Sequence, residues 1–231
     1  MAGKPSTEHA GGAHARAAQK RVAVLISGRG SNMTALIEAA KAPSYPARIV
    51  LVASNRADAA GLERARAEGI ATAVVHHATY GPDREAFERA LQVVLEEHLI
   101  DLVCLAGFMR LLTPWFVRRW EGRLLNIHPA LLPAFKGLNT HERVLAAGVP
   151  DHGATVHFVV PEMDAGPIIE QKQLQVLDTD DAATLARRVL ALEHQIYPQA
   201  LARVARGEVA MPRESEKSNS NPDATRDGEA G

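Results

Sequence analysis

The sequence predicts an α/β fold: a doubly wound, mainly parallel sheet with an antiparallel strand near the C-terminal part. Short β-branched apolar runs alternate with segments of helical spacing from residue 21 onward, the order found in repeated strand–helix units. Residues 102–106 are apolar at every position, as expected of a strand covered by helices on both faces. Residues 154–159 and 168–176 have strand patterns with no helix between them, which indicates the antiparallel addition.

Each expected element has a local reason. The expected strands are short runs of β-branched and apolar residues, and the expected helices have apolar residues three and four positions apart. Gly69 is expected to end the second helix, and Pro114 suits the first turn of the fourth helix. The expected strands are residues 21–26, 49–53, 72–75, 102–106, 124–128, 154–159 and 168–176. The expected helices are residues 33–41, 59–68, 83–98, 114–120, 140–147 and 181–206.

Length and composition suit one folded domain of ordinary globular character. The chain has 231 residues, of which 46% are hydrophobic, and we expect a domain over residues 21–212. Residues 1–20 and 213–231 are too polar and too rich in small residues to offset the entropy of ordering, so we expect disordered tails there.

The same figures exclude several classes of partner. A formal net charge of −1 and an aromatic content of 4% favour neither nucleic acid nor an anionic membrane. No stretch has the length and apolarity of a membrane span or a signal peptide, so we expect a cytoplasmic protein. The single cysteine, Cys104, lies in an apolar run and is expected to be a buried core residue.

A glycine-rich loop follows the first expected strand and opens the first expected helix. In residues 27–32, glycines allow close backbone approach, and the free N–H groups of the helix start favour an anion. The loop is not a Walker A motif, and Met33 stands where a dinucleotide fingerprint needs its third glycine. A single phosphate monoester therefore fits better than a pyrophosphate. The alternative is a tight turn capped by Ser31 or Asn32.

Asn126 and His128 are the strongest candidates for chemistry. They are two residues apart on an expected strand, so their side chains share a face, and Pro129 places them at its carboxyl end. An amide and an imidazole on one face can both donate to a carbonyl oxygen as it gains charge. Asp164, in a turn where Gly166 would allow close backbone approach, is the best candidate for the group that orients the imidazole. Alternatively, His128 is structural and Asp164 is a turn former.

No metal site is expected. His141, His152 and His157 could in principle contribute ligands, but no paired-histidine helix motif and no cysteine partner accompanies them.

Four motifs together resemble the phosphoribosylglycinamide formyltransferase family. They are residues 27–32, 105–110, 126–133 and 164–167, in the family's order, and the resemblance spans about residues 21–212. It implies a Rossmann-like formyltransferase fold. The string Asn-x-His-Pro-x-Leu-Leu-Pro is specific for folate-dependent formyl transfer, and the Gly-x-Gly-Ser-Asn loop points to the glycinamide ribonucleotide branch. The chain departs from the pattern at Lys136, where the family often has proline, so the turn near Phe135 is the part least determined by the resemblance.

The resemblance also implies the substrates. A formyl group would pass from the co-substrate 10-formyltetrahydrofolate to the amine of glycinamide ribonucleotide, a step of purine biosynthesis. The substrate phosphate would rest on Gly30, Ser31 and Asn32, and Glu193 would contact the ribose. The folate would contact Arg84, Met109, Arg110, Leu111, Leu112, Asn126, Val160, Pro161, Glu162, Met163 and Asp164. Arg84 could equally be a solvated charge at a helix start, and Glu193 a surface residue.

By the same resemblance, the amine would attack the formyl carbon directly, and Asn126 and protonated His128, with Asp164 beside it, would stabilise the tetrahedral oxyanion. A 10-formyltetrahydrofolate hydrolase is the alternative enzyme, and a non-enzymatic phosphate-binding module is the alternative outside enzymes. Methionyl-tRNA formyltransferases share the Asn-x-His core but add a basic domain, for which this chain has neither the length nor the charge. We expect a monomer or homodimer with small-molecule partners.

Overall fold

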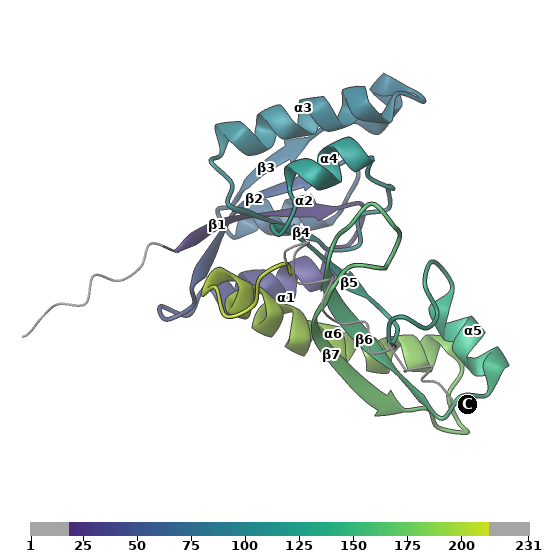
Figure 1. Ribbon diagram of the computed structural model, residues 1–231. Coiled ribbons are helices and arrows are strands. Elements are labelled where there is room, and N and C mark those ends of the chain that lie inside the picture. Colours follow the sequence, from purple (N-terminus) through teal and green to yellow (C-terminus); the bar gives the residue numbers. More distant parts are fainter. Residues whose placement is uncertain (1–18, 213–231) are drawn as a thin grey trace, which may run out of the picture.

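A seven-stranded sheet forms the centre of the protein (Figure 1). The computed structural model describes residues 19–212, so the expected disordered tails lie outside the described residues, apart from Gln19 and Lys20. The strands are β1 (Lys20–Ile26), β2 (Ala47–Ser54), β3 (Ala71–Val74), β4 (Leu102–Leu105), β5 (Leu124–His128), β6 (Asp151–Phe158) and β7 (Ile168–Gln175). The helices are α1 (Ser31–Ala40), α2 (Gly61–Ala67), η1 (His77–Tyr80), α3 (Arg84–Glu97), α4 (Pro114–Arg119), α5 (Thr140–Ala147) and α6 (Ala182–Ala205).

The strand order is β3-β2-β1-β4-β5-β6-β7. The first five strands in this order pair in parallel, and β6 runs antiparallel to both β5 and β7. The predicted fold class is therefore confirmed, with β6 as the reversed strand. The order changes direction between β1 and β4, and ligands of such sheets bind at the carboxyl ends of the strands at this switch point.

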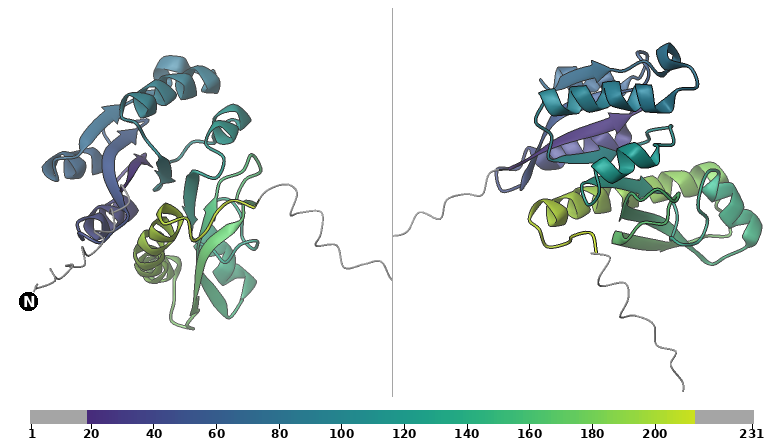
Figure 2. Two further views of the ribbon diagram at one scale, coloured as in Figure 1. Left: turned by 60° about the vertical axis from the view of Figure 1, so that its left-hand side comes forward. Right: turned by 45° about the horizontal axis from the view of Figure 1, so that its top comes forward.

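Two apolar cores cover the two faces of the sheet. Along β1, Val22, Val24 and Ile26 belong to the core beneath α1, α2 and α6, whereas Ala23 and Leu25 belong to the core beneath α3 and α4. This alternation is the period-two geometry of a strand, and it explains why the central strands are apolar at every position. Figure 2 shows α3 and α4 across the sheet from α1 and α6.

Among the described residues, no helix is both long and apolar enough to cross a membrane.

Two features differ most from the expected elements, whereas the other bounds lie within two residues of the expected ones. β6 begins at Asp151 rather than near residue 154, because residues 151–153 complete a ladder with Gln175, Leu174 and Gln173 of β7. The first residues of β6 have no apolar alternation, so the partner strand rather than local pattern makes them extended. The short helix η1 was not expected; its first amide, that of His77, donates to the carbonyl of Asn55 at 3.3 Å.

Candidate active site

The glycine-rich loop after β1 has the backbone of an anion site. Gly30 has a φ of +71°, a left-handed conformation that glycine adopts without strain, and α1 begins at the next residue. The start of α2 packs against the same loop, because the amide of Gly61 donates to the carbonyl of Gly28 at 3.0 Å. The first N–H groups of α1, which have no acceptor within the helix, therefore lie beside a loop that the start of α2 holds in place.

Asn32 joins this loop to α6. Its Nδ2 donates to Oε2 of Glu193 at 2.6 Å, and its Oδ1 is buried with no hydrogen-bond partner in the described part of the chain. Glu193 is only 7% exposed, so the alternative of a surface residue is wrong. Burial raises the pKa of Glu193, and the hydrogen bond from Asn32 opposes that effect. The structure thus brings two of the expected substrate-binding residues together.

Strand register places Asn126 and His128 beside two residues of β6. Asn126 pairs with His157, and His128 pairs with Thr155. The alternate residues Ala154, Val156 and Phe158 pack in the core beneath α6. Asn126, His128, Thr155 and His157 therefore share the opposite face, at the carboxyl end of β5.

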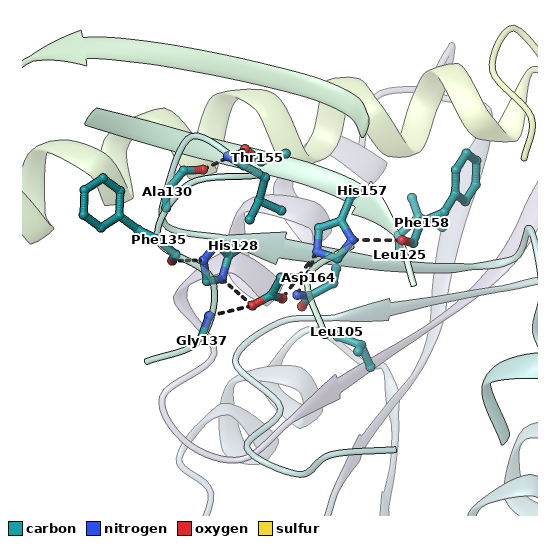
Figure 3. A network of polar contacts seen from close by, with 12 residues as sticks. Leu105, Leu125, His128, Ala130, Phe135, Gly137, Thr155, His157, Phe158 and Asp164 are labelled. Atoms are coloured by element: carbon teal, nitrogen blue, oxygen red, sulfur yellow. Dashed lines mark hydrogen bonds and ion pairs between the residues drawn. The ribbon is translucent and has the colours of Figure 1, made fainter. Parts of the chain in front are cut away.

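Asp164 lies between the two histidines of this face (Figure 3). Its Oδ2 is 3.5 Å from Nδ1 of His128, and its Oδ1 is 3.7 Å from Nε2 of His157. The backbone of Asp164 is left-handed, with a φ of +49°. Gly166 permits the approach of this turn, because a Cβ there would lie 1.7 Å from the carbonyl oxygen of Phe158. The predicted close backbone approach at Gly166 is confirmed.

Both ring nitrogens of His128 face oxygen atoms. Nε2 lies 3.0 Å from the carbonyl oxygen of Phe135, which can only accept, so Nε2 carries a proton. Nδ1 faces the Asp164 carboxylate at 3.5 Å, which is longer than a hydrogen bond. A proton on Nδ1 would thus be attracted to the Asp164 carboxylate but would form no short hydrogen bond with it. Nδ1 therefore remains available to a third atom.

His157 is a site residue that the sequence reasoning considered only as a metal ligand. Its Nδ1–H donates to the carbonyl of Phe158 at 2.8 Å, which leaves Nε2 to accept from Nδ2 of Asn126 at 3.3 Å. Burial is the main cause that lowers the pKa of His157 and favours this neutral form. The signal that could have identified it is its two-residue spacing from Thr155 on the strand that follows β5.

The segment after β4 forms an exposed apolar rim near the switch point. Met109 is 69% exposed and Leu111 62% exposed. The amide of Met109 donates to Oγ of Ser27 at 2.8 Å, and Ser27 Oγ donates to Oδ1 of Asn55 at 2.6 Å. Ser27, the first residue of the glycine-rich loop, therefore ties the two motifs together. Leu112 is half-buried against the core beneath α3 and α4.

The other expected folate residues lie on α3, on the rim and on the turn before Asp164. Arg84 is exposed at the first position of α3, and the guanidinium carbon of Arg110 lies 5.1 Å from the ring centroid of Phe87. On the turn, Val160 is half-buried, whereas Pro161, Glu162 and Met163 are exposed. The structure therefore leaves most of these side chains accessible to a ligand.

The three histidines considered as metal ligands separate into two places. His141 Nδ1 and His152 Nε2 are 3.0 Å apart, whereas His157 contacts Asn126 on the other face of β6. Burial lowers the pKa of His141, and it lowers that of His152 to about 4. Within residues 19–212, no three potential ligands gather in a way that could hold a metal ion.

Comparisons with known proteins converge on one family. A family sequence profile described as Formyl transferase matches residues 20–201. The chain is 45% identical over 190 residues to the phosphoribosylglycinamide formyltransferase of Escherichia coli (strain K12), which covers 82% of this chain and 89% of that protein. It is 54% identical over 191 residues to the trifunctional purine biosynthetic protein adenosine-3 of Bos taurus, but spans only 19% of that protein's length.

Solved structures agree. A phosphoribosylglycinamide formyltransferase from Coxiella burnetii, in complex with CHES, superposes with a TM-score of 0.80 at 45% identity, over 84% of this chain and 91% of that one. Glycinamide ribonucleotide transformylase 1 from Symbiobacterium toebii gives a TM-score of 0.81 at 45% identity, with the same coverage of both chains.

Proposed function

We propose that this chain, which belongs to the formyl transferase family, transfers a formyl group from 10-formyltetrahydrofolate to the amine of 5′-phosphoribosylglycinamide in purine biosynthesis. The observation that carries the proposal is the grouping of Asn126, His128 and Asp164 on one face of the sheet. The names of the relatives that match along most of their length support the choice of acceptor.

The chemistry begins with attack of the substrate amine on the formyl carbon. A new C–N bond forms, and the carbonyl electrons move to oxygen, giving a tetrahedral oxyanion. Asn126 Nδ2 retains one N–H beyond the one directed at His157, and His128 Nδ1–H is not fully engaged by Asp164, so both can donate to this oxygen. The Asp164 carboxylate, 3.5 Å from Nδ1, pairs with His128 in the protonated form that this step uses.

Collapse of the intermediate breaks the bond between the formyl carbon and the folate nitrogen. The attacking amine loses a proton and the departing nitrogen gains one, through a water held by Asp164. Protein groups and one water supply these steps, so activity is expected to survive dialysis against a chelator.

The two substrates approach this centre from different elements. The substrate phosphate binds at Gly30, Ser31 and Asn32, and Glu193 contacts the ribose from α6. The folate lies between the rim of Met109, Arg110, Leu111 and Leu112 on one side and Val160, Pro161, Glu162, Met163 and Asp164 on the other. Arg84 pairs with its acidic tail. The protein acts in the cytoplasm as a monomer or homodimer.

An assay with 10-formyltetrahydrofolate, run with and without glycinamide ribonucleotide, tests the proposal. Folate product should appear only when the amine is present. Product without the amine would identify a hydrolase, and absence of product in both assays would favour a phosphate-binding module.

Asn126→Ala and His128→Ala should each lower the rate by about a hundredfold to a thousandfold, because each removes one oxyanion donor. His76→Ala, which removes an exposed histidine, should retain the wild-type rate.

A further inference from the structure

The loop of residues 135–139 holds both members of the His128–Asp164 pair. The carbonyl of Phe135 accepts from Nε2 of His128 at 3.0 Å, and the amide of Gly137 donates to Oδ2 of Asp164 at 2.9 Å (Figure 3). The same carboxylate oxygen, Oδ2, faces Nδ1 of His128. The relative placement of imidazole and carboxylate therefore depends on two backbone groups of one loop, two residues apart.

This loop has a backbone that other contacts must hold. Phe135, Gly137 and Asn139 alternate in the left-handed region, with φ of +52°, +82° and +54°. Glycine tolerates that conformation, but a bulky residue such as Phe135 is strained in it, and such strain persists only where surrounding structure over-determines it. Lys136, between two left-handed residues, has no ring to restrict its φ as a proline would.

Arg143, on α5, supplies the restraint. Its Nη1 donates to the carbonyls of Lys136, at 2.6 Å, and Leu138, at 3.3 Å, the residues on either side of Gly137. Its guanidinium carbon lies 5.6 Å from the ring centroid of Phe135, within the range of a cation–π contact. One side chain thus contacts three residues of the strained loop, Phe135, Lys136 and Leu138, and a planar guanidinium is the cation best suited to do so.

We propose that Arg143 is a positioning residue, which fixes the 135–139 loop so that the Phe135 carbonyl and the Gly137 amide orient His128 and Asp164. Arg143 acts through this loop rather than on the reacting atoms. The kinetic part of the inference rests on the proposed function, whereas its structural part does not.

The structural part is tested by hydrogen exchange in the free protein. In Arg143→Ala, the Gly137 amide should exchange at least about tenfold faster than in wild type, because the loop opens locally, while amides of β4 and β5 and the thermal midpoint stay unchanged. Arg187→Ala is the matched control, since Arg187 is an exposed arginine whose Nη2, among residues 19–212, bonds within its own helix, to Thr184 at 3.0 Å. Unchanged exchange at Gly137 in Arg143→Ala would overturn the inference.

The kinetic part separates positioning from packing. Arg143→Ala and Arg143→Met should both lower kcat by about tenfold, with KM for both substrates within about twofold of wild type, because misplacement affects the transition state more than binding. Arg143→Lys, which keeps a positively charged donor group without the planar guanidinium, should recover part of that loss. Full kcat in Arg143→Met would show that the aliphatic stem suffices and would overturn the proposal. If the wild type has no transferase activity, the proposed function fails, and the exchange experiment alone decides the role of Arg143.

Discussion

The reactive atoms of Asn126 and His128 are oriented by neighbouring protein groups. His157 donates from Nδ1 to the carbonyl of Phe158, so its Nε2 presents a lone pair to the Asn126 amide. That acceptor selects the NH₂ end of Asn126 for this side and leaves its second N–H for the oxyanion. Because burial lowers the pKa of His157, the ring keeps this lone pair at neutral pH.

Replacing His157 tests whether this acceptor matters for catalysis. His157→Phe keeps a ring but removes the acceptor, so the Asn126 amide can rotate; we expect kcat to fall by about tenfold to a hundredfold with little change in KM. His157→Gln, whose side-chain oxygen can accept, should lose less. Steady-state kinetics of the two variants checks this. A wild-type kcat in His157→Phe would contradict it.

At the scale of elements, α3 anchors the segment that carries the apolar rim. Glu88 of α3 is buried and accepts from the amide of Thr113, at 2.7 Å, and from the hydroxyl of Thr113. Thr113 directly precedes α4 and directly follows Leu112, so Glu88 holds the end of the rim segment and the start of the next helix together. Burial raises the pKa of Glu88, and the Thr113 hydrogen bonds oppose that effect.

Truncating Glu88 should detach this segment. Glu88→Ala leaves the Thr113 donors without their buried partner, and we expect the free energy of unfolding to fall by about 2 kcal/mol. Glu88→Gln can still bond both Thr113 groups and should lose less. Because the folded-state pKa of Glu88 is raised, the contribution of this carboxyl to stability falls as the pH rises through that pKa, and Glu88→Gln lacks this contribution. Urea unfolding across pH, followed by circular dichroism, measures both effects; equal stability of Glu88→Ala and wild type would contradict the prediction.

At the scale of the whole molecule, folding takes histidines as well as apolar groups out of water. His152 is 1% exposed, and burial lowers its pKa from 6.5 to about 4, with His141 and His128 adding to the shift. Burial also lowers the pKa of His194 on α6. The folded protein therefore holds these rings neutral at a pH where the unfolded chain protonates them.

Acid should consequently destabilise the fold through His152. Between pH 6.5 and about 4 the unfolded chain binds a proton that the folded protein does not, so stability falls as the pH falls through that window and levels below it. The contribution of this residue is at most about 3 kcal/mol, from 1.36 kcal/mol for each pH unit. Urea unfolding at several pH values gives the free energy of unfolding as a function of pH. The slope of this free energy against pH should be shallower for His152→Gln than for wild type, and His76→Gln should keep the wild-type slope. Equal slopes in all three proteins would contradict this assignment.

Much of the secondary structure, and the shared face of Asn126 and His128, depends on local sequence patterns and could be predicted from them. Apolar period determines the strand–helix order, and α5 has the predicted bounds of residues 140–147, because its helix has a local pattern and ends at Gly148. The shared face of Asn126 and His128 follows from the period of two of a strand. The start of β6 did not follow, because a partner strand rather than its own residues makes it extended.

The sequence by itself therefore determined the fold class, the order of the elements and the side-chain types available at the switch point, since these depend on residues close together in the chain. Tertiary structure alone decided which of them meet. Asn126 meets His157, 31 residues away, through the register of β5 and β6, and Asn32 meets Glu193, 161 residues away, through the docking of α6. The contact of Arg143 with the 135–139 loop likewise depends on how α5 packs. The physical reason is that register and helix docking minimise the free energy of the whole packed chain, so they cannot be assigned to any one segment of it.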